Sequence, residues 1–114
     1  EIVLEIVVPM PSEGTTAVYD KYRTRKSIDF AILAVAGTLR LEEGIVKEIS
    51  LVLGAAAPIP MKLQEAEQYL LGNELTEETA KEAAEIALKK AIPLEMNGYK
   101  IEMAKVMIRR FLGF

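Results

Sequence analysis

The chain has 114 residues, of which 51% are apolar and 27% are charged, and its formal net charge is −3. This length suits one small domain with a real core, and the acidic balance argues against a general nucleic-acid binder, which relies on excess lysine and arginine. Cys and His are both absent, which excludes disulfides, thiolate nucleophiles, Cys-based zinc sites and the commonest general base. No apolar run approaches the roughly 18–20 residues that a transmembrane helix needs, and we expect a cytoplasmic protein.

The first predicted element is the segment Ile2–Val8, which is almost entirely apolar and β-branched. Pro9 and Pro11 stop it, as expected for a strand that is buried on both faces. Because the segment lacks a basic n-region and a cleavage pattern, it is not predicted to be a signal peptide. The chain also begins at Glu1 rather than Met, and we therefore expect a fragment whose upstream context has been removed.

A basic segment follows the loop PSEGTT and shows neither a helical nor a strand period. Between Tyr19 and Asp29 it holds four cations without obvious counter-charges: Lys21, Arg23, Arg25 and Lys26. One interpretation is a solvated loop, which would tolerate this charge. The other is a contact with an anion or cofactor, since lysine offers a point charge and arginine a planar fork, while Tyr19 and Tyr22 offer flat surfaces beside a ring system. The residues alone leave both interpretations open.

A hairpin is predicted next, from the alternation that begins at Ala31 and the return strand Ile45–Leu53. The turn LEEG places Gly44 where a positive φ is needed. Gly37 interrupts the first strand as a site for a bulge or a close approach. The residues expected to share the buried face are Leu33, Val35, Leu39 and Leu41 on the first strand and Ile49, Leu51 and Leu53 on the second.

Three helices are predicted after the proline-punctuated crossover Gly54–Pro60. The first covers Leu63–Leu71 and ends at a Gly-Asn pair, and the second follows Thr76 as its N-cap, with Glu at its start and Lys at its end. The third runs from about Tyr99 to Leu112. Because the strands precede the helices, the expected fold class is α+β, a two-layer arrangement in which a three-stranded antiparallel sheet packs against three helices.

Candidate enzymatic groups have simpler explanations. The acidic pairs Glu42–Glu43 and Glu77–Glu78 lie in a turn and at a helix start, where carboxylates are solvated, whereas an acid–base pair needs a pocket that splits the two pKa values. Without His, the sole nucleophile–base candidate is Ser27 beside Lys26, and adjacent side chains rarely point at one another usefully. We expect no catalytic residue and no metal site in this chain.

Three stretches, in this order and spacing, resemble a known family: YDKYRTRKSIDFAILAVAGTLRL, then VKEISLVLGAAAPIPMKLQEAEQYLLGN, then LTEETAKEAAEIALKKAIP. They are similar to the C-terminal domain of the flavoprotein (medium) subunit of molybdenum hydroxylases, a family that includes aerobic carbon monoxide dehydrogenase and xanthine dehydrogenase. The resemblance extends from Ile2 to about Phe111. It implies that residues 1–114 form a single domain of such a subunit, without the subunit's N-terminal FAD domain.

The resemblance implies an oxidoreductase in which this domain closes over the flavin end of FAD, a cofactor held chiefly by the N-terminal domain. The family's flavin-side lysine falls on Lys21. An aliphatic residue of the family's first strand falls on Val3, and Arg25 matches an arginine of the adjoining loop. The stretch RTRK departs from the more usual Gly-Arg-Arg of the family at this loop. A cation at this rim would favour a reduced, anionic flavin.

The resemblance also implies partners. Molybdopterin and iron–sulfur clusters belong to a molybdenum-cofactor subunit and an iron–sulfur subunit of the same complex, and electrons pass through FAD to an external acceptor. We do not expect the isolated chain to turn over, nor to bind nucleic acid or span a membrane, and an apolar surface left bare by the missing domain favours self-association as a homo-oligomer. The alternative is a non-catalytic interaction module without cofactor, which packs against a partner through its sheet or last helix.

Overall fold

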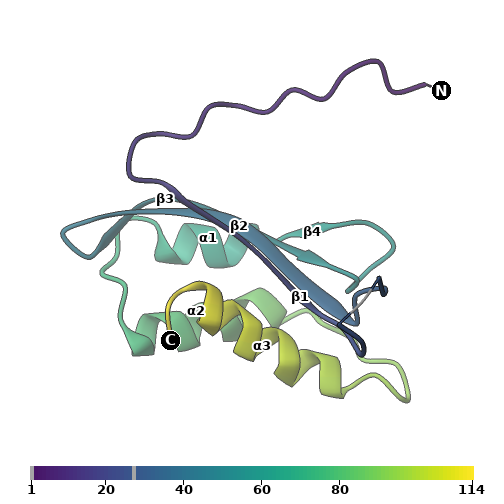
Figure 1. The fold of residues 1–114 in the computed structure, drawn as a ribbon. Helices are drawn as coiled ribbons and strands as arrows, with labels where there is room; N and C mark the ends of the chain where they lie inside the picture. Colours follow the sequence, from purple (N-terminus) through teal and green to yellow (C-terminus); the bar gives the residue numbers. More distant parts are fainter. Residues whose placement is uncertain (1, 27) are drawn as a thin grey trace.

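Helices cover one face of an antiparallel sheet in the computed structural model, which describes residues 2–26 and 28–114 (Figure 1). The strand order β1-β2-β3-β4 follows the order of the chain. The described elements are β1 (Thr16–Tyr22), β2 (Leu33–Glu42), β3 (Ile45–Gly54), β4 (Met61–Lys62), α1 (Gln64–Leu70), α2 (Glu77–Leu88) and α3 (Tyr99–Phe111). This arrangement confirms the predicted α+β class with an antiparallel sheet and three helices. None of the described helices is long and apolar enough to cross a membrane.

The sheet has four strands rather than three, and its first strand is β1 and not the predicted strand Ile2–Val8. That segment runs extended above the sheet (Figure 1), and its large apolar side chains are 77–93% exposed. A strand buried on both faces needs a covering layer on each side, and the helices supply one layer only. The predicted buried strand Ile2–Val8 is therefore wrong, because this fold offers no second layer that would bury it.

Strand β1 begins at Thr16 and overlaps the first part of the basic segment, for which the sequence shows no period. Among the described strands it pairs with β2 alone, and five of its seven residues are exposed. The register places Tyr19 opposite Ala36 and Lys21 opposite Ala34. These positions alternate with the buried Leu33 of β2, so Tyr19 and Lys21 lie on the face away from the helices. An edge strand with both faces open tolerates polar residues on each, which removes the alternation that predicts a strand.

The β2–β3 hairpin is confirmed. Its two-residue loop has positive φ at both Glu43 (52°) and Gly44 (81°), the combination that matches the twist of the flanking strands. A register shift follows, since Arg40 pairs with Glu48 whereas Leu41 pairs with Val46. The shift skips Lys47 and brings the fully buried Val46 to the helix-facing side, so the bulge keeps a lysine out of the core.

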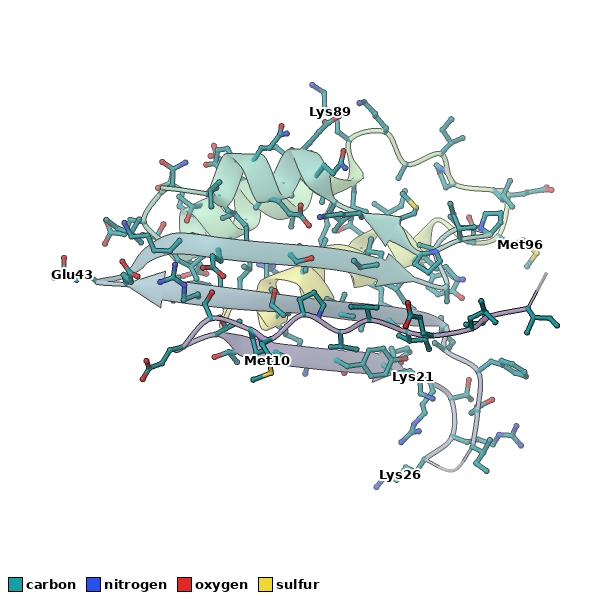
Figure 2. All side chains as sticks on the ribbon, turned by 90° about the horizontal axis from the view of Figure 1, so that it is seen from above. Met10, Lys21, Lys26, Glu43, Lys89 and Met96 are labelled. Atoms are coloured by element: carbon teal, nitrogen blue, oxygen red, sulfur yellow. The ribbon has the colours of Figure 1, made fainter. Side chains whose placement is uncertain are left out.

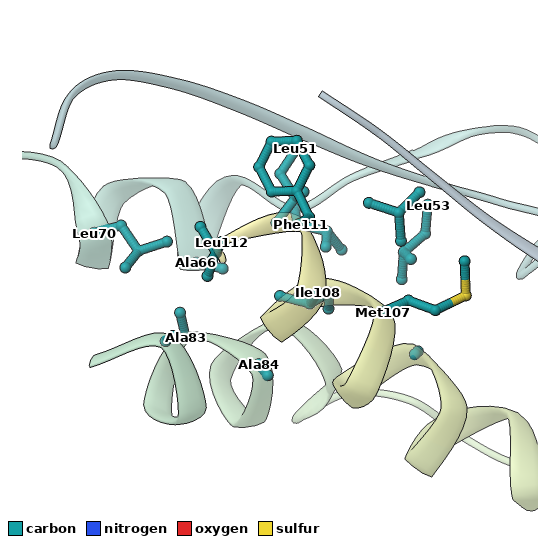
Figure 3. Close-up of a cluster of buried hydrophobic side chains, with 14 of the residues drawn as sticks. Leu51, Leu53, Ala66, Leu70, Ala83, Ala84, Met107, Ile108, Phe111 and Leu112 are labelled. Carbon is teal, nitrogen blue, oxygen red and sulfur yellow. The ribbon is translucent and has the colours of Figure 1, made fainter. Parts of the chain in front are cut away.

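The core lies between the helix-facing side of the sheet and the three helices. Figure 3 shows Leu51 and Leu53 of β3 above Ile108 and Met107 of α3, with small alanines on the facing helices. Alanine at these positions permits close approach between helix backbones. The buried cluster consists of Leu33, Val35, Val46, Leu51, Leu53, Leu63, Ala66, Leu70, Ala80, Ala83, Ala84, Ala104, Met107, Ile108, Phe111 and Leu112.

The start of α2 is as predicted. Thr76 is its N-cap, and the backbone N–H of Thr79 donates to the Thr76 hydroxyl at 3.2 Å. The Thr79 hydroxyl accepts in return from the backbone N–H of Thr76 at 2.9 Å. This reciprocal capping satisfies two otherwise unpaired N–H groups at the helix start, and Glu77 and Glu78 in the first turn suit the helix dipole.

Candidate functional site

The loop that joins β1 to β2 carries most of the positive charge noted in the sequence. Lys21 precedes it on β1, and the backbone N–H of Ile32 donates to the Tyr22 carbonyl at 2.8 Å, which closes the loop at its base. Figure 2 shows Lys21 and Lys26 at the end of the sheet opposite to Glu43, at the tip of the β2–β3 hairpin. The cations therefore gather at one end of the molecule. Ser27 lies outside the described residues.

Asp29 organises this loop through its side chain. Its carboxylate accepts from the backbone N–H of Phe30 at 3.0 Å and from the backbone N–H of Arg25 at 3.2 Å. It also pairs with the Arg25 guanidinium, whose Nε lies 3.4 Å from Oδ2. The expectation that the cations lack counter-charges is therefore wrong for Arg25. The guanidinium of Arg25 also holds the pKa of the Asp29 carboxyl below its ordinary value.

Lys21 meets the same residue in a different way. Its Nζ donates to the main-chain carbonyl oxygen of Asp29 at 3.2 Å. A carbonyl is neutral, and among the described residues no carboxylate lies within ion-pair distance of Lys21. Asp29 thus brings together two of the three predicted site residues, Lys21 and Arg25, but it forms an ion pair with Arg25 alone. Of these two cations, Lys21 is the one without an ion-pair partner among the described residues.

A floor of small side chains lies beside Lys21. Ala17, Ala34 and Ala36 occupy the sheet face away from the helices, as their alternation with the buried residues of β2 requires. Ala34 is nearly buried although it lies on this outer face, because the register sets it opposite the stem of Lys21. Tyr19 lies on the same face, opposite Ala36. The face therefore combines small side chains, one aromatic ring and the Lys21 ammonium, a set that fits a planar ring that carries negative charge.

The remaining predicted contacts are not gathered here. Val3 lies in the exposed N-terminal segment and is 79% exposed. Tyr19 lies on the outer face with Lys21, whereas Tyr22, three residues along the strand, lies on the opposite face. The two tyrosines therefore do not form one ring-binding surface. Ile28 and Phe30, which flank Asp29, are 100% and 95% exposed, as apolar side chains at a protein contact would be in the absence of the partner.

Sequence reasoning missed Asp29 as a site residue, although a signal was present. Arg25 and Asp29 are four residues apart, and an aspartate at the end of a loop commonly accepts from nearby backbone N–H groups. The acidic pairs lie where the sequence predicts: Glu42 pairs with Arg40 at the exposed hairpin end, and Glu77–Glu78 begin α2. Among the described residues, no group of three or more acids could hold a metal ion.

A hollow of about 270 Å³ lies near the start of β2, beneath the connection between α2 and α3. Its lining is mainly apolar and includes Leu33, Leu53 and Ile92. Its two lysines are both engaged: Lys90 pairs with Glu65, and Lys100 donates to a backbone carbonyl. The described lining residues include no carboxylate or hydroxyl group, and the hollow suits an apolar group.

Comparison with known proteins shows which family this chain resembles. Residues 17–113 match the CO dehydrogenase flavoprotein C-terminal domain. The chain is 33% identical, over 117 aligned residues, to the carbon monoxide dehydrogenase medium chain of Hydrogenophaga pseudoflava, covering 99% of this chain and 40% of that one. It is 32% identical over 85 residues to a putative xanthine dehydrogenase FAD-binding subunit of Escherichia coli K12, covering 75% of this chain and 29% of the relative.

A solved structure agrees with these sequence matches. The carbon monoxide dehydrogenase of Hydrogenophaga pseudoflava that lacks the Mo-pyranopterin moiety of its molybdenum cofactor superposes with a TM-score of 0.81 at 34% identity. The match covers 90% of this chain and 37% of that chain. The chain therefore spans about two fifths of the relatives whose fold it shares.

Proposed function

The chain belongs to the CO dehydrogenase flavoprotein C-terminal domain family, and from this premise we propose that it is the C-terminal domain of an FAD-binding subunit of a molybdenum hydroxylase. In this role the outer sheet face beside Lys21 covers the flavin end of FAD. An upstream domain of the same subunit holds most of the cofactor. The relatives are named as subunits of carbon monoxide and xanthine dehydrogenases, which supports membership of an oxidoreductase complex.

The observation that carries this proposal is the position and the hydrogen bonding of the Lys21 ammonium. Its ammonium is fixed by a neutral carbonyl at 3.2 Å and borders a floor of alanines. FAD, when bound, supplies the electron transfer, while the protein supplies orientation and electrostatics. A retained positive charge beside the ring favours the form of the cofactor that carries negative charge. The residues present therefore fit the flavin end of FAD.

The other proposed contacts have smaller parts. The guanidinium of Arg25 forms an ion pair with the Asp29 carboxylate. Its proposed contribution is therefore to shape the loop and not to place a second unpaired cation beside the flavin. Val3 offers an apolar side chain in the exposed N-terminal segment, and in the proposed subunit it meets the ring from the side of the upstream domain. No residue here is assigned to a chemical step, and the isolated chain is proposed to be inactive.

We also propose that partner subunits carry the remaining cofactors, a molybdenum cofactor and iron–sulfur clusters, in a cytoplasmic complex. The exposed apolar side chains of the loop tip, Ile28 and Phe30, and the apolar segment Ile2–Val8 are the surfaces proposed to meet the upstream domain or a partner subunit. Burial of these apolar side chains at such a contact would stabilise the complex through the hydrophobic effect.

FAD titration followed by flavin fluorescence quenching tests the proposal. The titration compares this chain alone with a longer chain in which the upstream domain of the subunit is present. We expect saturable binding by the longer chain and little by the short one. The longer chain with Lys21→Met should bind FAD more weakly, whereas Lys47→Met, at the opposite end of the sheet, should match the unmodified chain.

The competing interpretation is an interaction module without a cofactor. The exposed Ile28 and Phe30 fit either interpretation, so the titration decides between them. Failure of both the short and the longer chain to bind FAD would favour the interaction module. Binding that is unaffected by Lys21→Met would retain the flavoprotein assignment but remove Lys21 from the contact.

A further inference from the structure

The carboxylate of Asp29 and its carbonyl oxygen perform different tasks. The carboxylate accepts from the backbone N–H groups of Arg25 and Phe30 at 3.2 and 3.0 Å, and it pairs with the Arg25 side chain. These bonds fix the main chain on both sides of Asp29. The carbonyl of that fixed main chain then accepts from Lys21 Nζ at 3.2 Å. The Lys21 ammonium is therefore held by the main-chain carbonyl of Asp29. The Asp29 carboxylate fixes the position of that carbonyl, although it forms no ion pair with Lys21.

The exposed fractions of the Asp29 and Arg25 side chains agree with this division. The side chain of Asp29 is 16% exposed, whereas that of Arg25 is 72% exposed. A carboxylate that is largely covered and accepts several hydrogen bonds holds a single orientation. Lys21 is itself partly buried on the edge strand, so the loop and the strand end form one unit.

We propose that Asp29 is a positioning residue, which sets the place of the Lys21 ammonium at the flavin rim through its own main-chain carbonyl. This inference rests on the proposed function, in which Lys21 meets the flavin. Asp29 need not touch the cofactor. Its effect passes through Lys21, and the loop residues that it clamps give the rim its shape.

The sign of the flavin potential separates positioning from a direct charge effect. A cation beside the ring stabilises the reduced, negatively charged cofactor and so raises its reduction potential. Removal of a nearby carboxylate, by its charge alone, would raise the potential further. Removal of a carboxylate that positions the cation would instead lower the potential, because the cation moves away. The two effects have opposite signs.

The experiment uses the complete FAD-loaded subunit and measures its flavin reduction potential and its FAD affinity. The variants are Asp29→Ala, Lys21→Met and the control Asp20→Ala. Asp20 carries the same charge one residue before Lys21, but it lies on the opposite, helix-facing side of β1. Positioning predicts that Asp29→Ala lowers the potential as Lys21→Met does, and that Asp20→Ala does not. Circular dichroism checks that each variant is folded, and Asp29→Asn replaces the alanine variant where needed, with a smaller shift of the same sign.

The remaining outcomes overturn the inference in distinguishable ways. A potential that rises in Asp29→Ala as in Asp20→Ala identifies a charge effect, and an unchanged potential removes Asp29 from the site. In both cases a lowered potential in Lys21→Met leaves the proposed function standing. If Lys21→Met changes neither the potential nor the FAD affinity, the proposed contact of Lys21 fails and the positioning role fails with it.

Discussion

Gly37 of β2 lies directly against the ring of Phe111 at the end of α3. A Cβ atom added to Gly37 would stand 2.9 Å from the ring and 2.2 Å from the carbonyl oxygen of Ser50 on β3. The Phe111 ring packs against the inner strand β2, and only a residue without a side chain at position 37 leaves room for it. Of the two alternatives predicted at Gly37, a bulge or a close approach, the structure shows the close approach, whereas the bulge lies between Arg40 and Leu41.

The first prediction concerns this contact. Gly37→Ala should destabilise the fold by about 1–3 kcal/mol, the usual cost of forcing extra atoms into a packed core. Urea unfolding followed by circular dichroism measures it. The control is Gly54→Ala on β3, where the nearest atom would lie at an ordinary 3.5 Å. Equal stability of the two variants would contradict the packing described for Phe111.

The second prediction concerns the buried face of α3. Ile108 is fully buried in the core cluster, so Ile108→Ala should cost about 2–5 kcal/mol through lost burial and the cavity left behind. Val106, on the same helix, is 43% exposed, and Val106→Ala should change the unfolding free energy by no more than about 0.5 kcal/mol. Thermal or urea unfolding of the pair tests the orientation of the helix, which a similar cost at both positions would refute.

The third prediction concerns the exposed N-terminal segment. Because its apolar side chains are exposed, removal of residues 1–9 should change the unfolding free energy by no more than about 0.5 kcal/mol. The same removal should reduce self-association of the isolated chain, measured by sedimentation velocity at rising concentration. Replacement of Ile2, Ile6 and Val8 by serine keeps the length and serves as a control with the same expected result. A large loss of stability would mean that the segment packs on this fold.

The fourth prediction concerns pH. Arg25 lowers the pKa of Asp29 from its ordinary value of 3.8, so the folded loop binds this proton less readily than the unfolded chain does. The stabilisation of the loop is therefore present above the ordinary aspartate pKa and is lost as the pH falls through the lowered value. Carboxyl NMR titration should give a lowered pKa for Asp29 and a return toward 3.8 in Arg25→Ala. An identical titration of Asp29 in both proteins would contradict the ion pair between Arg25 and Asp29.

Local chemistry explains what the sequence predicts well in this protein. The cap at Thr76 and the turn at Gly44 depend on residues within a few positions of one another, and the structure confirms both. The alternation of β2 and β3 reports directly on a sheet with helices on one face. Such features need no knowledge of the rest of the molecule.

The errors arise where the outcome depends on distant parts of the fold. Ile2–Val8 has the composition of a buried strand, but burial requires a second covering layer, which no local pattern specifies. Strand β1 is hidden because an edge strand keeps polar residues on both faces. The role of Asp29 depends on how the loop folds back upon Arg25 and Lys21, and charge counting along the sequence cannot show which cation is neutralised.

The order of the sheet has a consequence for how the molecule folds. Each strand pairs with its neighbour along the chain, so the sheet can grow by short loop closures, the kind of topology associated with rapid folding. The contact of Phe111 with Gly37 is different, because it joins the end of the chain to an early strand. Closing so long a loop is entropically costly, and we expect this contact to form after the hairpin contacts between neighbouring strands.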